Sequence, residues 1–321
     1  MSVMKHYWMC LLLLLSLIAI GVGKHSGAEE QLQPQIIRTS AAQSVNDTAH
    51  SYFTALITLS LYLTEREFGP AQLVISTEAI TQGRWFRLLE NSRYLDVVWA
   101  GAEPQRNRDY FAIPIDILGG ILGVRSLIIR KSDRYKFTQI QTIDDLSKYT
   151  ACQGQHWPDT DILKSAGLPV LTVNRFESNF LMLSKGRCDY FPRGIHEGYS
   201  EIEQYHVING NDLVLFDDLL LAYPFNMFLY VDKANSDLAK RLKLGLERAI
   251  DSGELVELMR RHPVTAHLFP LSKWNEPVLL QIDNPLHVEV IDGRPWWLLP
   301  SFGFYSELSW AKNTPEAPKN K

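Results

Sequence analysis

Strand-like and helix-like segments alternate along most of this chain, and the alternation runs twice. A first run predicts strands at 35–40, 71–77, 94–101 and 122–132, with helices at 49–69 and 79–92. A second run predicts helices at 142–149, 159–167 and 177–186, with strands at 150–154, 168–176 and 187–194. Such alternation is typical of parallel sheets with helices on both faces. We therefore expect an α/β fold with two lobes, each a mostly parallel sheet flanked by helices.

Two apolar strand-like segments, at 122–132 and 219–233, are the predicted hinge crossings between these lobes. The chain has 321 residues, which is more than one simple core needs. Helices predicted at 236–251 and 254–261 would then return to the first lobe. We predict lobe one at 31–128 plus 226–300, lobe two at 129–225 and a C-terminal tail at 301–321.

The N-terminal segment is typical of a secretory signal. Lys5 precedes an apolar run over residues 7–20, and small residues follow it. The run falls short of the ~20 residues that a membrane-spanning helix needs. Ser26-Gly27-Ala28 is the favoured cleavage site, and Gly21-Val22-Gly23 is the alternative. We therefore expect residues 1–28 to be a cleaved signal peptide and the mature protein to be exported.

Composition excludes several classes of function. The formal net charge is −4, so the basic surface of a nucleic-acid binder is not expected. The chain has no Gly-x-Ser-x-Gly, His-Glu-x-x-His, Cys-x-x-Cys or phosphate-loop motif. No catalytic residue, metal site or cofactor is predicted.

Cys152 and Cys188 remain after signal cleavage, and an oxidising compartment would permit a disulfide. Two small buried thiols in neighbouring strands are the favoured interpretation.

Polar segments follow three of the predicted strands, at 99–106, 153–160 and 192–197. Ligands of open α/β sheets bind beyond the carboxyl ends of strands, so we expect these segments to line a cleft between the lobes. The predicted ligand-binding residues are Trp99, Gly101, Arg106, Gln153, Gly154, Gln155, His156, Trp157, Arg193 and Glu197.

Several of these residues have a structural alternative. Trp157 would either stack on a ligand or cover the core of lobe two. Arg193 would either face the cleft or form an internal salt bridge to Glu197 or Glu201. Asp159 is expected to be the N-cap of the following helix.

The segments "LDVVWAGAEPQR" (95–106) and "AIDSGELVELMRR" (249–261), with the block at 153–197, resemble the type 2 periplasmic solute-binding proteins. The resemblance is to the family-3, amino-acid-type branch, in an uncharacterised bacterial subgroup. It implies the two-lobed type II periplasmic-binding fold. It also implies that Arg106, or Arg108 if the turn is in another register, holds a ligand carboxylate. Members of the branch carry an acid where this chain has Arg193, and this departure favours an anionic ligand.

The resemblance implies a periplasmic protein that traps a small polar, anionic solute by hinge closure, for transport or sensing. Its expected partners are the solute and a membrane transporter or sensor subunit, and a monomer is expected. One alternative is a dehydratase-like enzyme on the same fold, similar to cyclohexadienyl dehydratases, with Glu197 or Asp159 as the general acid. Another is a ligand-sensing signalling module.

Overall fold

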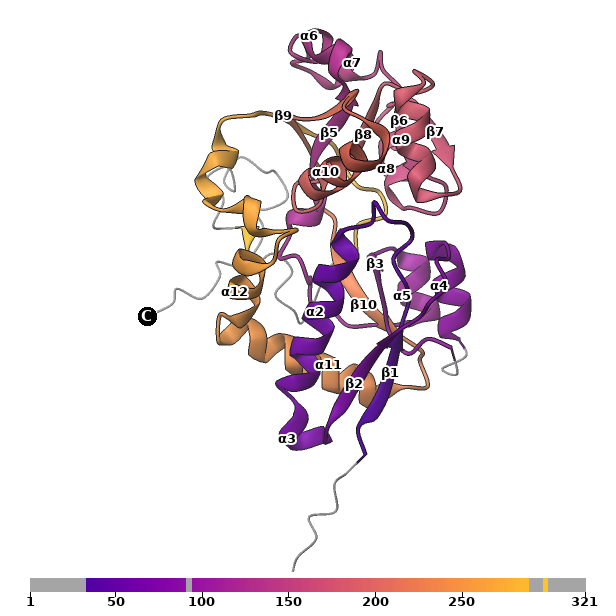
Figure 1. Cartoon of the computed structure of the whole chain (residues 1–321), viewed down its shortest axis with the longest axis vertical. Coiled ribbons are helices and arrows are strands. Elements are labelled where there is room, and N and C mark those ends of the chain that lie inside the picture. The colour runs from indigo at the N-terminus through magenta and orange to yellow at the C-terminus, as the bar shows by residue number, and fades with distance from the viewer. Residues whose placement is uncertain (1–32, 91–93, 289–296, 300–321) are drawn as a thin grey trace, which may run out of the picture. The chain divides into compact units, whose positions relative to one another are not determined.

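The computed structural model describes residues 33–90, 94–288 and 297–299. The predicted signal peptide at 1–28 and the predicted tail at 301–321 lie outside these residues. From Pro34 onward the chain forms one compact unit, in which two sets of strands can be distinguished. We call the elements around the first set lobe one and those around the second set lobe two (Figure 1). Within the described ranges, no helix is long and apolar enough to cross a membrane.

Lobe one is built on two small sheets. One pairs β1 (Gln35–Thr39) with β2 (Ala71–Ile75) in parallel; the other has β10 (Met227–Val231) between β3 (Val98–Gly101) and β4 (Phe111–Ala112). The Thr39 hydroxyl donates to the Val97 carbonyl at 2.8 Å, which joins the two sheets edge to edge. The helices of this lobe are α2 (Ala49–Tyr62), α3 (Glu65–Phe68), α4 (Gln82–Leu89), α5 (Pro104–Asp109), α11 (Ser236–Asp251) and α12 (Glu254–Arg261).

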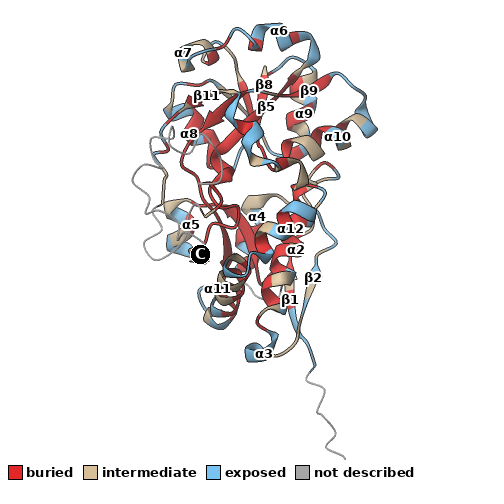
Figure 2. Cartoon of the chain, turned by 90° about the vertical axis from the view of Figure 1, so that its left-hand side faces the viewer, coloured by how far each residue is buried: buried red, intermediate tan, exposed pale blue. Residues whose placement is uncertain are grey.

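Lobe two contains a six-stranded mixed sheet in the order β11-β9-β5-β8-β6-β7. Its strands are β5 (Val124–Arg130), β6 (Ala151–Gly154), β7 (Val170–Val173), β8 (Tyr190–Gly194), β9 (Leu213–Ala222) and β11 (Val278–Gln281). Its helices are α6 (Arg134–Phe137), α7 (Ile143–Leu146), α8 (Asp159–Ser165), α9 (Phe176–Ser184) and α10 (Gly198–Asn209). Strand β5 runs antiparallel to both of its neighbours, β8 and β9. The predicted α/β class is confirmed, and buried residues gather on the strands (Figure 2).

One predicted strand is wrong. The apolar run at 219–233 is not continuous, because β9 ends at Ala222 in the six-stranded sheet and β10 begins at Met227 in the sheet of lobe one. Pro224 lies between them and has no N–H to contribute to a ladder. This segment and the one before β5 cross between the lobes, as predicted, and the chain crosses again between α12 and β11. The predicted residue boundaries of the lobes stay a prediction, although β5 and β11 both belong to the six-stranded sheet.

The two longest helices of lobe one pack closely because of one glycine. Leu238, Leu242 and Leu246 lie one turn apart on α11 and are buried, as their spacing predicts. A Cβ atom at Gly245 would lie 2.2 Å from the Ser60 carbonyl oxygen of α2. Glycine at this position therefore allows the backbones of α2 and α11 to approach each other.

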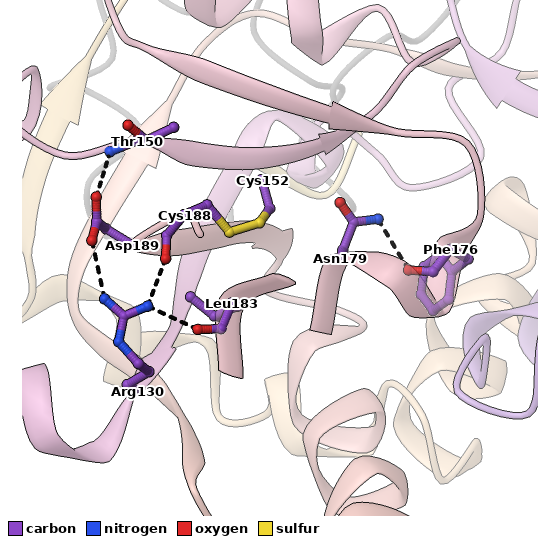
Figure 3. Close-up of a disulfide and its surroundings, with 8 residues drawn as sticks. All are labelled: Arg130, Thr150, Cys152, Phe176, Asn179, Leu183, Cys188 and Asp189. Atoms are coloured by element: carbon purple, nitrogen blue, oxygen red, sulfur yellow. Dashed lines mark hydrogen bonds and ion pairs between the residues drawn. A yellow bond between two sulfur atoms is a disulfide. The ribbon is translucent and has the colours of Figure 1, made fainter. Parts of the chain in front are cut away.

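Cys152 and Cys188 form a disulfide, which corrects the interpretation of two free thiols (Figure 3). Their Cα atoms are 5.7 Å apart, within the range that a disulfide spans. Cys152 lies in β6 and Cys188 just precedes β8, so the bond joins two neighbouring strands of lobe two. Arg130 holds the same turn, donating to the carbonyl of Cys188 at 2.6 Å and to that of Leu183 at 2.8 Å.

Asp116 lies at the crossing before β5 and is fully buried. Its carboxyl accepts hydrogen bonds from the backbone N–H groups of Leu118 at 2.9 Å and Gly120 at 3.2 Å. Burial outweighs these bonds and raises the pKa of Asp116 to about 8. The unfolded chain loses this proton near pH 4, whereas the folded chain keeps it to about pH 8. Stability from this group is therefore lost as the pH rises through this window.

We expect the free energy of unfolding to fall by about 2 kcal/mol between pH 5 and pH 6.5 on account of Asp116, at ~1.4 kcal/mol per pH unit. Asp116→Asn cannot titrate and should flatten this dependence in urea unfolding curves. Asp145→Asn is the matched control, because its pKa is lowered to about 2 by Lys148 and Thr142 and it does not titrate in this range. Equal slopes for the wild type and Asp116→Asn would contradict the assignment.

Candidate functional site

A cavity of about 70 Å³ lies between the lobes. Lobe one contributes the loop before α2, helix α4 and strand β3, and lobe two contributes β8, the turn before α8 and the starts of α9 and α10. The crossings supply Leu122 and Phe225. Of the predicted site residues, Trp99, Gly101, Trp157, Arg193 and Glu197 line this cavity. The cavity has room for a few water molecules.

Arg193, from β8, is held by two carboxyl groups of α10. Its Nε and Nη2 both donate to Glu201 at 2.7 Å, which is a bidentate pair, and Nη2 also lies 3.0 Å from Glu197. The internal salt bridge that the sequence left open is therefore formed, while Arg193 also lines the cavity. Within the described part of the chain, its Nη1 makes no hydrogen bond.

The carboxyl groups around Arg193 differ in acidity. Burial alone would raise the pKa of Glu197, but Arg193 and the other charges beside it hold that pKa below its usual value. Burial raises the pKa of Glu201 to about 8, against the charge of Arg193. His196 is fully buried and neither ring nitrogen forms a hydrogen bond, so burial lowers its pKa to about 4. Glu197 is thus held ionised, and His196 is held neutral.

A second buried arginine, Arg125 of β5, lies in the same cavity and was not predicted. Its Nη2 donates to Asp159 at 2.6 Å, its Nε donates to the Tyr223 hydroxyl at 3.0 Å, and its Nη1 lies 3.5 Å from Glu197. Asp159 is therefore not the N-cap that the sequence predicts, since Pro158 holds that position and Asp159 pairs with Arg125. The arginine was missed because it lies inside an apolar strand pattern.

Aromatic residues form the lobe-one wall of the cavity. Trp99 lies 5.1 Å from Phe53 and 5.7 Å from Trp85, measured between ring centroids. Trp85 is 1% exposed, and its Nε1–H has no hydrogen-bond partner among the described residues. Gln82, one turn before it on α4, has a buried side-chain oxygen without a partner. Both residues line the cavity. They were not predicted, because the only local signal is the amphipathic pattern of their helix.

Arg106 lies elsewhere, in a hollow of about 340 Å³ with Gln155, His156 and Trp157. Its Nε lies 2.7 Å from Glu103, its Nη1 donates to the Gly101 carbonyl at 3.0 Å, and its Nη2 donates to the His156 carbonyl at 2.9 Å. The last bond joins the two lobes. A carboxylate clamp at Arg106 stays a prediction, because all three of its donor nitrogens bind protein groups here. Arg108, the alternative, donates to Gln105 on the surface.

The turn at 153–157 has a mixed role. Trp157 covers Gly154, where a Cβ atom would lie 2.6 Å from the indole ring, and it stacks 6.1 Å from Phe191 of lobe two. The same residue lines the cavity. Trp157 thus covers the core of lobe two, and its stacking on a ligand stays a prediction. Gln153 is 1% exposed and lines none of the hollows described here, while neither side-chain amide atom has a partner. Gln155 and His156 are exposed at the mouth of the cleft.

No three His, Cys, Asp or Glu side chains of the described residues are arranged to hold a metal ion. The site is instead two guanidinium groups, their carboxyl partners and aromatic walls. Its remaining capacity for hydrogen bonds is concentrated at Trp85, Gln82 and the free edge of Arg193.

No model of a known protein family matches the chain, and no curated protein matches its sequence. Solved structures do match. An arginine-specific periplasmic binding protein of Salmonella typhimurium has a TM-score of 0.53 at 13% identity, over 71% of this chain and 98% of its own. An ancestral arginine-binding protein has a TM-score of 0.51 at 14% identity, over 70% and 97%. The structure described for glutathione import through GshT in Streptococcus mutans has a TM-score of 0.52 at 11% identity, over 72% and 95%.

These identities show the fold alone. The chain has the two-lobed fold of periplasmic binding proteins, and the fold implied by the resemblance at 95–106, 153–197 and 249–261 is confirmed. The neighbours above include binders of amino acids, which is the branch that the resemblance indicated.

Proposed function

We propose that this chain binds a small polar solute in the cavity between the lobes. The observation that carries the proposal is Trp85, whose indole N–H is buried without a partner at the cavity wall. An unsatisfied buried donor costs about 1–3 kcal/mol, and a bound solute with an acceptor atom would remove that cost. The fold supports this proposal, because the solved neighbours described above include binding proteins. Hinge closure around a ligand is a known motion of periplasmic binding proteins.

The solute is proposed to be an anion. Trp85 and Arg193 both line the cavity with donor groups, while Arg125 is already paired with Asp159, Glu197 and Tyr223. A carboxylate would accept from Trp85 and Arg193 and would gain a charge-assisted hydrogen bond. The proposal therefore rests on these two residues rather than on Arg106, which contacts His156 across the cleft.

The cellular role is proposed from the fold and the predicted signal peptide. The protein acts in the periplasm as a monomer, closes by a hinge at the segments that cross between the lobes, and delivers the solute to a membrane transporter or sensor subunit. No catalytic step is assigned. A general acid must hold a proton near its working pH, whereas the neighbouring arginines keep the pKa of Glu197 below its usual value. Asp159 is engaged by Arg125.

Titration calorimetry with succinate, succinamide and 1,4-diaminobutane tests the charge preference, because the three compounds share a four-carbon chain. Succinate should bind most tightly. Trp85→Phe keeps an aromatic ring but removes the N–H, and should weaken succinate binding about 10-fold or more, as expected for a hydrogen bond to a charged acceptor.

Trp274→Phe is the matched control for this loss. Its indole N–H already donates to the Leu268 carbonyl at 3.0 Å, away from the cavity. This variant should bind succinate as the wild type does, even if it is less stable. Tighter binding of the diamine than of succinate, or no binding of succinate, would overturn the proposed anion site.

A further inference from the structure

The guanidinium of Arg193 is enclosed by aromatic rings as well as by carboxyl groups. Its central carbon lies 5.1 Å from the ring of Trp157, 5.3 Å from that of Phe176 and 5.0 Å from that of Phe191. Its edge faces Glu201 and Glu197, at 2.7 Å and 3.0 Å. Aromatic faces and bidentate carboxylates are the groups that bind guanidinium ions in proteins.

All of these partners belong to lobe two. Phe191 and Arg193 lie on β8, Phe176 begins α9, Glu197 and Glu201 belong to α10 or its start, and Trp157 lies in the turn before α8. The pocket around the guanidinium therefore exists whether the lobes are open or closed. Arg193 is 7% exposed and Glu201 is fully buried, so the surrounding charges are shielded from water.

We propose that Arg193 is a built-in occupant of a guanidinium-binding pocket and determines the charge specificity of the site. Its side chain neutralises carboxyl groups that would otherwise attract a cationic solute. The same side chain lines the cavity. The specificity role rests on the proposed function, whereas the existence of the pocket does not.

Truncation of Arg193 should leave this pocket empty and able to bind a free guanidinium. Arg193→Ala should unfold at a lower temperature than the wild type. N-ethylguanidinium, which replaces the removed atoms, should raise the midpoint of the variant by about 3 °C when added at ten times its Kd. The assay is best run at several pH values from 8 upward, because burial raises the pKa of Glu201 and loss of the Arg193 charge raises it further. Ethylammonium chloride and sodium chloride at the same concentration should have no comparable effect.

Two further variants sharpen the test. Arg134→Ala is the matched control, because Arg134 also pairs with a carboxylate, Asp218, and lies 5.1 Å from the Phe216 ring, but on the surface. N-ethylguanidinium should not raise its midpoint. In Arg193→Ala/Glu201→Leu the bidentate partner is lost, and N-ethylguanidinium should bind at least about 10-fold more weakly than to Arg193→Ala.

The outcomes separate the two proposals. A folded Arg193→Ala that is not stabilised by N-ethylguanidinium beyond the salt controls overturns the pocket. If Arg193→Ala does not fold alone, the denatured variant is diluted into buffer with N-ethylguanidinium or with ethylammonium. Folded protein in N-ethylguanidinium but not in ethylammonium supports the pocket. Folded protein in neither overturns it. Wild-type binding of succinate is measured independently, so its failure would reject the proposed solute while the rescue result still decides on the pocket.

Discussion

Arg125→Met should lower the free energy of unfolding by about 3–5 kcal/mol, as expected when one partner of a buried ion pair is removed. Arg125 is 3% exposed and binds Asp159, Glu197 and Tyr223. Methionine fills a similar volume, so the main change is electrostatic: Asp159 would stay buried without its closest positive charge. Urea unfolding at pH 7 measures the difference.

Two comparisons make this expectation specific to the buried pair. In Arg125→Met/Asp159→Asn the unpaired carboxylate of Asp159 is also removed, and most of the lost free energy of unfolding should be recovered. In Arg134→Met a different arginine loses its carboxylate partner, Asp218, but both side chains are exposed, at 48% and 58%. Such a pair contributes at most about 1 kcal/mol. If Arg125→Met loses no more stability than Arg134→Met, the interaction of Arg125 with Asp159 is not the strong buried ion pair that its geometry indicates.

Much of the fold could be predicted because its signals are local. Helices α11 and α12 begin and end where leucine spacing and Gly253 place them. Helix α7 lies within the range predicted at 142–149 and begins with a capping box of Thr142 and Asp145. Gly167 follows α8 with a φ of 77°, which glycine adopts readily. The prediction of one continuous strand at 219–233 was wrong because the signal that divides it is not local. Its composition is apolar throughout, and only its pairing with two different sheets shows where it divides.

The candidate site was predictable only in outline. Strand ends locate the cleft, and Trp99, Trp157 and Arg193 do line the cavity. Arg125 and Trp85 were not found, because an arginine in a strand and a tryptophan in an amphipathic helix are indistinguishable from ordinary surface and core residues. The partners of Arg106 could not be predicted from the sequence either, because its hydrogen bond to the His156 carbonyl depends on how the two lobes meet.

The disulfide is a second contact between distant segments that local sequence could not predict. Cys152 and Cys188 are 36 residues apart, and nothing local brings them together. Their contact follows from the pairing of β6 with β8, a property of the sheet that the sequence order of strands does not specify. Buried thiols and a buried disulfide also occupy similar apolar surroundings, so burial cannot distinguish them.

Replacing both cysteines by alanine should lower the free energy of unfolding by about 4 kcal/mol. The bond closes a loop of 36 residues, and the chain-entropy model gives roughly this value for the freedom it removes from the unfolded chain. Dithiothreitol should destabilise the wild type by a similar amount and leave the double-alanine variant unchanged, which separates loss of the bond from loss of sulfur packing. The bond is directly tested by thiol titration of the mature protein in denaturant. Two reactive thiols in protein isolated under oxidising conditions would contradict the disulfide, and their absence until reduction would establish it.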